Sequence, residues 1–534
     1  MIVQVWSATP TGVRGTLIQV EVHATGGLPR FYLVGLPDRT VNESRERIES
    51  ALKSSATQFP RGRIIVNLAP ADVHKEGSTF DLPIAVGLYG ASHKEMMQRI
   101  APLLSKTAFI GELGLSGECR SVRGVLPICL ELKRQGFTRI VLPIHHVGEA
   151  TLVNGLEIVG ISTLREVFDW LHRGCPKGTS QDSRDDNSSK TRSPNKIKSP
   201  PFDGIVGQSF AKRAMVIAAA GHHHTLMVGP PGCGKTMLAR SVRHLMPPMN
   251  EEERLDVMSI HSLVDSSKRN HLLGGDFHQL TRPFRAPHTS ATLASLLGGG
   301  PKATPGECSL AHHGVLFLDE LAEFTRNVLE ALRQPIEDRV ITLTRQKRTV
   351  EYPANALVIA AMNPSPDGSW PDSLLQDEAQ QRRAIRYQEK ISGPLRDRFD
   401  LFVEMDRVDI ASISDPKTEQ NQDSMDEEDS LLDQIQEARN RQSHRYGRAL
   451  TNSTLTAAQV KTSIKKHSSV EPLLCQAATS FGLSMRAVHR LLKVAQTIAD
   501  LDGADLVSVH HVAEALMFRP QRMNSTSVSK SQID

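Results

Sequence analysis

A chain of 534 residues is too long for one hydrophobic core, so two or three domains are expected. Its hydrophobic fraction of 39% and charged fraction of 23% are those of a globular protein and exclude a largely disordered chain. No apolar run reaches about 18 residues and the N-terminus has no signal-peptide pattern, so neither a membrane span nor secretion is expected. The six cysteines form no C-x-x-C pair, which argues against disulfides or a zinc knuckle and favours the cytoplasm. The net charge of +4 permits a nucleic-acid partner without requiring one.

Two polar stretches divide the chain. Residues 173–200 are rich in Ser, Asp, Lys and Pro and cannot form a core, so they predict a flexible linker. Residues 413–430 hold a run of carboxylates and predict a solvated acidic loop. The predicted fold is therefore multidomain α/β, with an N-terminal domain at 1–172, a central α/β core at 201–412, a helical domain at 431–520 and a disordered tail at 521–534.

The N-terminal domain has a mixed pattern of strands and helices. Alternating apolar residues predict strands at Thr16–Val22 and Ile64–Leu68. Helices are predicted at Val41–Lys53 and at the more apolar Asp81–Tyr89. Towards the C-terminus, apolar residues recur at three and four over Ser484–Phe518, which is typical of helices.

A glycine-rich loop follows the short apolar run Thr225–Val228 and precedes a helical pattern. This strand–loop–helix context makes the match to a phosphate-binding loop specific, because glycines let the backbone wrap the phosphates and the helix N-terminus supplies N–H donors. Lys235 is the charge for the β- and γ-phosphates, and Thr236 offers its hydroxyl to magnesium, so ATP and Mg²⁺ are the expected cofactors. The nucleotide-binding loop consists of Gly229, Pro230, Pro231, Gly232, Cys233, Gly234, Lys235 and Thr236.

Two carboxylates end a second buried strand. The apolar run Val315–Leu318 precedes Asp319 and Glu320, at the end of a strand where open α/β sheets present ligands. Asp319 is expected to hold magnesium, directly or through water, and Glu320 to act as general base on the attacking water. Such a pair alone is a weak signal, but after a phosphate-binding loop it predicts an ATP hydrolysis site.

Three further residues resemble parts of AAA+ ATPases. A third apolar strand ends at Asn363, which in that class orients the lytic water. The segment Leu395–Asp400 resembles an arginine-finger segment, so the resemblance implies that Arg398 reaches the γ-phosphate of a neighbouring subunit. Arg486 resembles the lid arginine that senses nucleotide from within the same chain. A finger that acts between subunits implies a ring of identical chains, most readily a hexamer.

The spacing of these motifs indicates an insertion. Lys235 and Asp319 are 84 residues apart (319 − 235), which is long for this class. The segment Arg339–Tyr352 then predicts two β arms around a basic tip that carries Arg345, Lys347 and Arg348. A hairpin that projects cations into a ring pore could follow a DNA phosphate backbone. A solvated hairpin with no such role remains the alternative.

Longer segments carry a closer resemblance. RPFRAPH, GGGPKATPGE, SLAHHGVLFLDELAEF and KISGPLRDRFDL, with YLVGLPD and RIIVNLAPAD nearer the N-terminus, are similar to magnesium-chelatase-type AAA+ proteins of the ComM/YifB family. The resemblance implies an α+β N-terminal domain related to the Lon protease domain, a hexameric α/β core and an α-helical lid. It also implies DNA branch migration, a helicase activity, during recombination or natural transformation. The cysteine-rich patch that often follows the Asn-Pro of the third strand is absent here.

Two other readings of single residues are weaker. His222–His224 and His312–His313 invite a metal site, but adjacent positions do not converge on one face, so loop histidines are expected. The Lon resemblance raises the question of a peptidase, for which Ser78 and Thr79 are the nearest nucleophiles. No lysine stands in the matching later segment, so peptidase activity is not expected.

The sequence favours an ATP-driven ring motor on branched or single-stranded DNA. The first rival is a chelatase motor subunit that uses the same core to drive metal insertion. An ATP-dependent unfoldase or protease is the second, and a DNA-binding regulator with a vestigial ATPase is the third. The intact Lys235, Asp319, Glu320 and Arg398 oppose the last of these.

Overall fold

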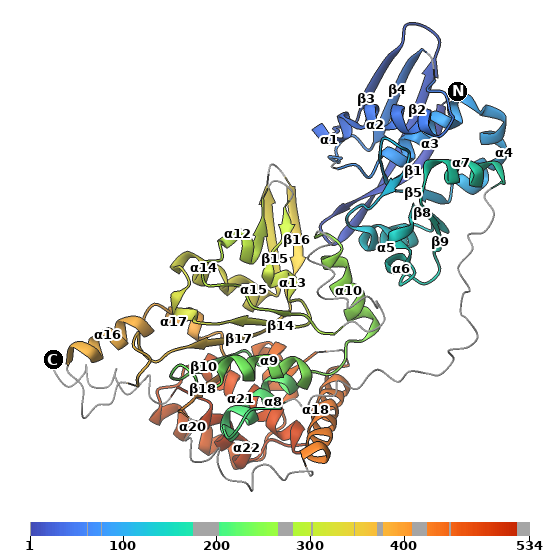
Figure 1. The fold of residues 1–534 in the computed structure, drawn as a ribbon. Helices are drawn as coiled ribbons and strands as arrows, with labels where there is room; N and C mark the ends of the chain where they lie inside the picture. Colours follow the sequence, from blue (N-terminus) through green and yellow to red (C-terminus); the bar gives the residue numbers. More distant parts are fainter. Residues whose placement is uncertain are drawn as a thin grey trace.

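The computed structural model describes residues 2–60, 62–75, 77–174, 202–264, 281–300, 303–345, 348–370, 378–407, 424–447 and 450–520. Within these residues the chain forms two large sheets, with a group of helices beside the second (Figure 1). No helix in the described ranges is long and apolar enough to span a bilayer. The predicted linker from residue 175 onward and the predicted tail at 521–534 lie outside the described residues.

A seven-stranded mixed sheet in the order β3-β4-β2-β1-β5-β8-β9 forms the N-terminal part. Its strands are β1 (Ile2–Thr11), β2 (Arg14–Thr25), β3 (Arg30–Val34), β4 (Arg63–Ala69), β5 (Thr107–Phe109), β8 (Arg139–Pro143) and β9 (Glu157–Ile161). Antiparallel pairing joins β1 to β2 and β2 to β4, whereas β3 pairs in parallel with β4 and the β1-β5-β8-β9 half is parallel throughout. The strands predicted at Thr16–Val22 and Ile64–Leu68 lie within β2 and β4.

Helices cover the two faces of this sheet unequally. One face forms a core with α2 (Ser44–Ser54), α3 (Asp81–Ser92), α4 (Lys94–Leu104) and α7 (Leu164–His172). The other face packs against α5 (Val125–Arg134), which contacts β1 and β2. At the β3 end, the side chains of β2, β3 and β4 that point away from the first core are exposed or half-buried, because side chains alternate across a strand. This end of the sheet is therefore covered on one face only.

The predicted helices of this part are both present, with one change. Asp81–Tyr89 lies within α3, whose buried residues include every position from Asp81 to Gly90. Val41–Lys53 is divided into α1 (Arg39–Asn42) and α2. The helix predicted at Val41–Lys53 is therefore in the correct place, but the structure interrupts it near its start.

The second sheet has five parallel strands in the order β11-β14-β17-β10-β18. Its strands are β10 (Thr225–Val228), β11 (Phe284–Arg285), β14 (Val315–Leu318), β17 (Leu357–Met362) and β18 (Leu401–Glu404). All residues of β10, β14 and β17 are buried, which explains their continuous apolar sequences. The strand order reverses at β10, and ligands of such sheets bind outside the carboxyl ends of the strands at this point.

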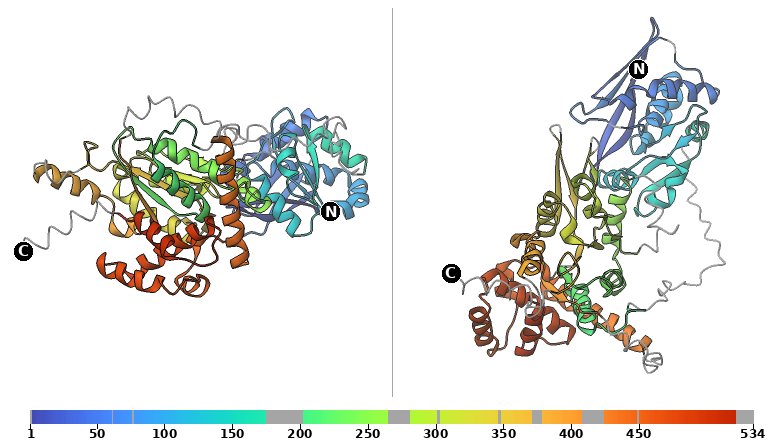
Figure 2. Two further views of the ribbon diagram at one scale, coloured as in Figure 1. Left: turned by 90° about the horizontal axis from the view of Figure 1, so that it is seen from below. Right: turned by 60° about the vertical axis from the view of Figure 1, so that its left-hand side comes forward.

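Two insertions of the second sheet meet the N-terminal part. The hairpin of β15 (Val340–Arg345) and β16 (Arg348–Pro353) is antiparallel, as the sequence predicts, and places Arg345 opposite Arg348. At the β1–β2 turn, a Cβ on Gly12 would come within 2.6 Å of the Val350 Cγ1 of β16. Helix α10 (Glu251–His261) buries Met258 in the core of α5, and the Gly124 N–H donates to the Ser262 carbonyl just after α10 (2.9 Å; Figures 1 and 2).

The helical domain begins earlier than predicted. Its main helices are α18 (Ser424–Tyr446), α19 (Ala457–Ser463), α20 (Val470–Ser480), α21 (Met485–Leu501) and α22 (Val509–Met517). Because α18 starts at Ser424, the end of the stretch predicted as an acidic loop is helical, and residues 413–423 lie outside the described residues. Acidic residues near a helix N-terminus are stabilised by the helix dipole, so the same carboxylates that indicated a loop also favour this start.

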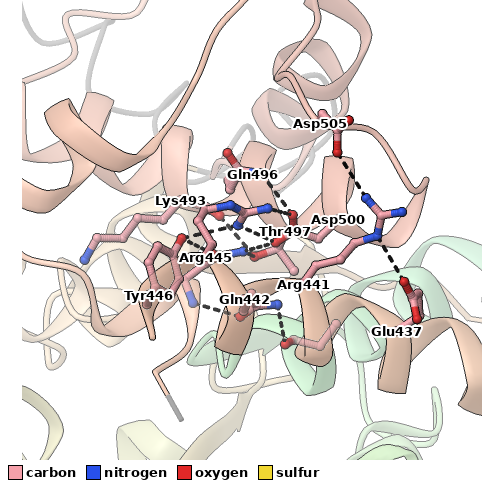
Figure 3. Close-up of polar contacts among 12 residues, drawn as sticks. Glu437, Arg441, Gln442, Arg445, Tyr446, Lys493, Gln496, Thr497, Asp500 and Asp505 are labelled. Atoms are coloured by element: carbon pink, nitrogen blue, oxygen red, sulfur yellow. Dashed lines mark hydrogen bonds and ion pairs between the residues drawn. The ribbon is translucent and has the colours of Figure 1, made fainter. Parts of the chain in front are cut away.

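A buried polar network lies inside this helical domain (Figure 3) and joins it to the second sheet through His223. Asp500 is fully buried and accepts hydrogen bonds from Arg445, from Asn452 Nδ2 (2.8 Å) and from Gln496 Nε2 (3.0 Å). Asn452 also contacts the Thr497 hydroxyl (2.9 Å), which lies 2.8 Å from Nε2 of His223. The network continues through the His223 ring into the sheet, just before β10.

Candidate nucleotide-hydrolysis site

Backbone requirements fix the shape of the phosphate-binding loop between β10 and α9 (Lys235–Leu245). Gly232 (φ 82°) and Gly234 (φ 92°) both adopt left-handed backbone conformations that favour glycine. Gly229 is required for a different reason, since a Cβ there would come within 2.7 Å of the Met405 carbonyl oxygen. The loop therefore turns sharply and starts α9 with its N–H groups facing the loop, which is the arrangement that binds phosphate.

Lys235 is held inside this loop. Its ammonium donates to the carbonyls of Gly229 (2.5 Å) and Pro230 (2.9 Å) and to Oδ1 of Asn363 (3.2 Å). Burial lowers the pKa of Lys235, the direction in which desolvation acts on an ammonium. Phosphate oxygens can take over the positions of these neutral acceptors, and their negative charge would restore the pKa.

Thr236 and Asp319 form a pair suited to magnesium. The Thr236 hydroxyl donates to Oδ2 of Asp319 (3.1 Å), although the two residues come from different strand ends. The other Asp319 oxygen accepts the Glu320 N–H (3.0 Å), and Glu320 itself has a left-handed backbone (φ 48°). A hydroxyl beside a carboxylate is a set of hard oxygen donors, so the residues present fit Mg²⁺ with a bound nucleotide.

Asn363 closes the site from the third strand. It follows β17, which lies between β10 and β14 in the sheet, and its side chain reaches the Lys235 ammonium. The carboxyl ends of β10, β14 and β17 thus bring together Lys235, Thr236, Asp319 and Asn363. The sequence predicted each of these residues separately, and the structure places them at one edge of one sheet.

The two predicted arginines lie together at another place. Arg398, between α17 (Gly393–Arg396) and β18, and Arg486, at the start of α21, donate to opposite oxygens of Glu337. The distance from Arg486 Nη2 to Glu337 Oε1 is 2.9 Å. Among the described residues, the hydrogen bonds and ion pairs of Lys235, Thr236 and Asp319 include neither arginine. The sensing role of Arg486 within its own chain stays a prediction.

Glu337 and Arg490 are functional candidates that the sequence reasoning missed. Glu337 ends α15 (Arg333–Asp338) beside a groove of about 370 Å³ that Arg398 also lines. Arg490, one turn after Arg486 on α21, donates to the carbonyls of Asp397 (2.6 Å) and Phe399 (3.0 Å) and so fixes the backbone on both sides of Arg398. The i, i+4 spacing of the two α21 arginines was the available signal, since such residues share one helix face.

The first group of histidines is buried within the loop that precedes β10. Desolvation lowers the pKa of His224 to about 4, and its Nδ1 accepts the Val358 N–H (3.1 Å). His223 bonds Asp400 Oδ2 through Nδ1 (2.9 Å) and the Thr497 hydroxyl through Nε2. These side chains support the sheet, and their position in a loop is the expected one.

The second group converges with a carboxylate. Asp256 of α10 brings an oxygen within 4.8 Å of ring nitrogens of His312 and His313, which adjacent spacing alone did not predict. However, the His312 Nδ1 accepts the Asn355 N–H (3.0 Å), so the proton of the neutral ring is on Nε2. Metal-binding histidines instead donate from the nitrogen that does not hold the metal, and we assign no metal to this group.

Among the described residues of the N-terminal domain, the candidate nucleophile Ser78 has a carboxylate rather than a lysine as its hydrogen-bond partner. The Ser78 hydroxyl donates to Glu112, and the fully buried Lys75 ammonium donates to the Pro70 carbonyl. Burial lowers the pKa of Lys75, but its recorded partner is this carbonyl rather than Ser78. That this domain is not a peptidase stays a prediction.

The basic hairpin tip is described only in part. Arg345 ends β15 and Arg348 begins β16, and the backbone register pairs them across the hairpin. Lys347 lies outside the described residues. Contact of these three residues with DNA stays a prediction.

Family models match most of the chain. The model described as "Magnesium chelatase, subunit ChlI" matches residues 201–413, "Subunit ChlI of Mg-chelatase" matches residues 20–146, and "Magnesium chelatase, subunit ChlI C-terminal" matches residues 427–519. The fold and the site together define an AAA+ ATPase-type protein of the magnesium-chelatase class. This supports an ATP-hydrolysing motor that uses Mg²⁺.

Relatives of similar length identify the family within this class. The competence protein ComM of Haemophilus influenzae is 38% identical over 515 residues, which cover 96% of this chain and 97% of ComM. YifB of Escherichia coli is 38% identical over 512 residues, which cover 95% of each chain. The chain belongs to the ComM/YifB family of magnesium-chelatase-type proteins, which confirms the resemblance seen in its motifs. Lon protease 2 of Bacillus subtilis is 28% identical over 155 residues, covering 28% of this chain and 27% of that protease.

Proposed function

We propose that this chain is an ATP-hydrolysing ring motor that moves single-stranded or branched DNA, as a branch-migration or helicase factor in recombination or natural transformation. The convergence of Lys235, Thr236, Asp319 and Asn363 at one sheet edge carries the ATPase part of the proposal. The antiparallel hairpin with arginines at both sides of its tip, and the competence name of the ComM relative, support the DNA part. Cytoplasmic location and a Lon-like N-terminal scaffold belong to the same proposal.

The chemistry follows from the residues at the sheet edge. Lys235 exchanges the Gly229 and Pro230 carbonyls for the β- and γ-phosphate oxygens. Glu320 accepts a proton from the water that Asn363 orients while the water oxygen bonds to the γ-phosphorus. The bond between the γ-phosphorus and the β–γ bridging oxygen breaks, so the products are ADP and phosphate. Thr236 and Asp319 would hold magnesium, which would neutralise charge on the phosphates.

Each site is completed by a second subunit. Arg398 and Arg486 contact Glu337 rather than the phosphate-binding loop of their own chain. We therefore propose that both act on the site of a neighbour, which for Arg486 replaces the role within its own chain. A permanently charged guanidinium suits the charge that develops on the γ-phosphate. The chain then works as a closed homo-oligomer, and a hexamer is the proposed ring.

Mixing two inactive variants tests the shared site. Lys235→Ala and Arg398→Ala are each expected to reduce ATPase by at least about 10³-fold. In a mixture, an Arg398→Ala subunit supplies an intact loop and a Lys235→Ala neighbour supplies an intact arginine, so about a quarter of random interfaces regain both parts. No recovery in mixed rings, with assembly verified by light scattering, would reject action between subunits.

The substrate is tested by stimulation of ATPase. The full chain is assayed alone, with linear DNA, with a four-way junction and with denatured casein. Stimulation by the junction or by single strands supports the DNA motor, and stimulation by casein alone would reverse the proposal in favour of an unfoldase. Porphyrin-dependent turnover would favour the chelatase-type motor, the second candidate that the family models bring forward.

The hairpin is tested by the variant Arg345→Ala/Lys347→Ala/Arg348→Ala. Basal ATPase should stay within about twofold, because these residues lie outside the hydrolysis site, while DNA-stimulated turnover falls. Each lost phosphate contact on a single strand reduces the slope of log K against log salt by about 0.7. Unchanged DNA affinity and stimulation would remove the hairpin from the mechanism.

A further inference from the structure

Cations and aromatic rings gather where β3 and β4 begin, at the end of the N-terminal sheet that is away from the ATPase sheet (Figure 1). Arg30 and Arg63 are paired across β3 and β4, and both are exposed. Two more exposed cations, Arg45 and Lys53, come from α2 beside the same strand. We call this group the β3 corner; it consists of Arg30, Phe31, Tyr32, Arg45, Lys53, Phe59 and Arg63.

On the open face of the sheet, the corner presents a tyrosine ring between two guanidinium groups. Tyr32 is 38% exposed. The Arg63 guanidinium lies 5.4 Å from the ring centroid, and Arg30 Nη1 donates to the Tyr32 hydroxyl (3.2 Å). The arginine contact lowers the pKa of this hydroxyl, mainly through the hydrogen bond. One ring is thus oriented by arginines and left accessible.

Around the edge strand, the corner continues into a groove of about 500 Å³ between β3 and α2. Phe31 and Phe59 form its apolar side with ring centroids 6.4 Å apart, and the Arg45 guanidinium is 5.9 Å from the Phe31 centroid. Lys53 also lines the groove. The lining contains one carboxylate, Glu49, which is bonded to Lys53 (2.9 Å).

We propose that the β3 corner binds single-stranded nucleic acid, with the backbone along its four cations and a base stacked on Tyr32. The four cations of the corner complement a chain of phosphates, and the groove lining adds a single carboxylate, Glu49. Aromatic rings add affinity only for bases that are free to unstack from their neighbours, which favours a single strand over a duplex. The inference extends the proposed DNA motor, because it gives the strand a second binding surface outside the ring core.

The position of the corner agrees with this role. At the opposite end of β1 and β2 from the corner, Gly12 of the same sheet lies against Val350 of the β15–β16 hairpin. This hairpin is the element proposed to bind DNA in the ring pore. The strands β1 and β2 therefore connect the corner to β16 within one rigid sheet. A strand that leaves the hairpin can be held by the corner without any change in the hydrolysis site.

The test measures binding of the full chain to a fluorescent 20-nucleotide oligo-dT by anisotropy over a range of salt. Arg30→Glu/Arg63→Glu should weaken binding more than tenfold, and the neutral pair Arg30→Gln/Arg63→Gln should reduce the salt slope by about 1.4. Tyr32→Ala should weaken binding about tenfold, and Tyr32→Phe, which keeps the ring, by less than about threefold. Lys133→Glu/Arg134→Glu on α5, which also removes two exposed cations from this domain, is the matched control and should leave the slope unchanged.

Each outcome decides the matter. If the corner variants keep wild-type affinity for oligo-dT and the wild-type salt slope, the corner does not bind the strand. If DNA still stimulates their ATPase, the motor proposal is unaffected. A wild-type chain that binds no oligo-dT overturns both. Displacement of oligo-dT by poly-glutamate at equal charge concentration would assign the corner to an acidic peptide instead. Thermal unfolding of each variant verifies folding, and the glutamine pair keeps the test valid where the glutamate pair does not fold.

Discussion

The substitution Asp500→Asn tests whether the helical domain is held to the ATPase sheet by its buried network (Figure 3). Asp500 has no exposed side-chain surface and receives donors from Arg445, Asn452 and Gln496. Asparagine has nearly the same shape, but its NH₂ group would face these donors. Burial alone would lower the pKa of Arg445, yet the bond to Asp500 outweighs it and raises that pKa, so the pair is coupled in the folded protein.

The expected cost follows from burial. Removing one partner of a buried ion pair costs about 3–5 kcal/mol. Because the Arg445 side chain keeps 22% exposure, the lower end of about 3 kcal/mol applies. At about 2 °C per kcal/mol for a unit of this size, the Tm of the ATPase part should fall by about 6 °C.

Asp505→Asn provides a control of the same chemistry. Asp505 pairs with Arg441 of α18 at 3.4 Å, close to the first pair, but its side chain is 95% exposed (Figure 3). The Tm of the Asp505→Asn variant should change by less than about 1 °C, since exposed ion pairs contribute little to stability. Calorimetry of both variants against the wild type gives the comparison. Equal shifts, or a shift below about 2 °C for Asp500→Asn, would refute the reasoning.

Three further changes test the site and its supports. Glu320→Gln should lower kcat by about 10²–10⁴-fold while a fluorescent ATP analogue still binds; retained turnover would exclude Glu320 as the base. Glu337→Gln should lower kcat about 10–100-fold by releasing Arg398, whereas Glu330→Gln on the neighbouring helix should change it less than about twofold. Burial alone would raise the pKa of Asp400, but its bond to His223 lowers it. Its stabilisation is therefore present above about pH 4 and lost as pH falls, and Asp400→Asn should flatten the fall of Tm below pH 4.

Local chemistry explains why the nucleotide site was predictable. A phosphate-binding loop needs glycines at fixed positions and a lysine at the helix start, so Gly232, Gly234 and Lys235 are readable without tertiary information. Buried parallel strands need continuous apolar runs, which located Asp319 and Asn363 at strand ends. The hairpin was predictable for the same reason, because its two arms pair with each other.

Long-range pairing explains what the sequence could not show. Glu337 and Arg486 are 149 residues apart, and nothing local to either marks the other as a partner. The Thr497–His223 bond likewise joins positions 274 apart. The start of α18 was missed because a run of carboxylates is compatible both with a solvated loop and with the first turns of a helix.

The N-terminal sheet packs against α10 and β16, so a change in its position reports movement of these inserted elements. Its contacts with the rest of the chain include Gly124 with Ser262 and Gly12 with Val350, and both partners belong to or follow elements inserted into the ATPase sheet. A displacement of either insertion during turnover must therefore carry the N-terminal sheet with it. A donor dye on α4 and an acceptor on α20 would then record each nucleotide cycle as a change in energy transfer, with no label near the hydrolysis site.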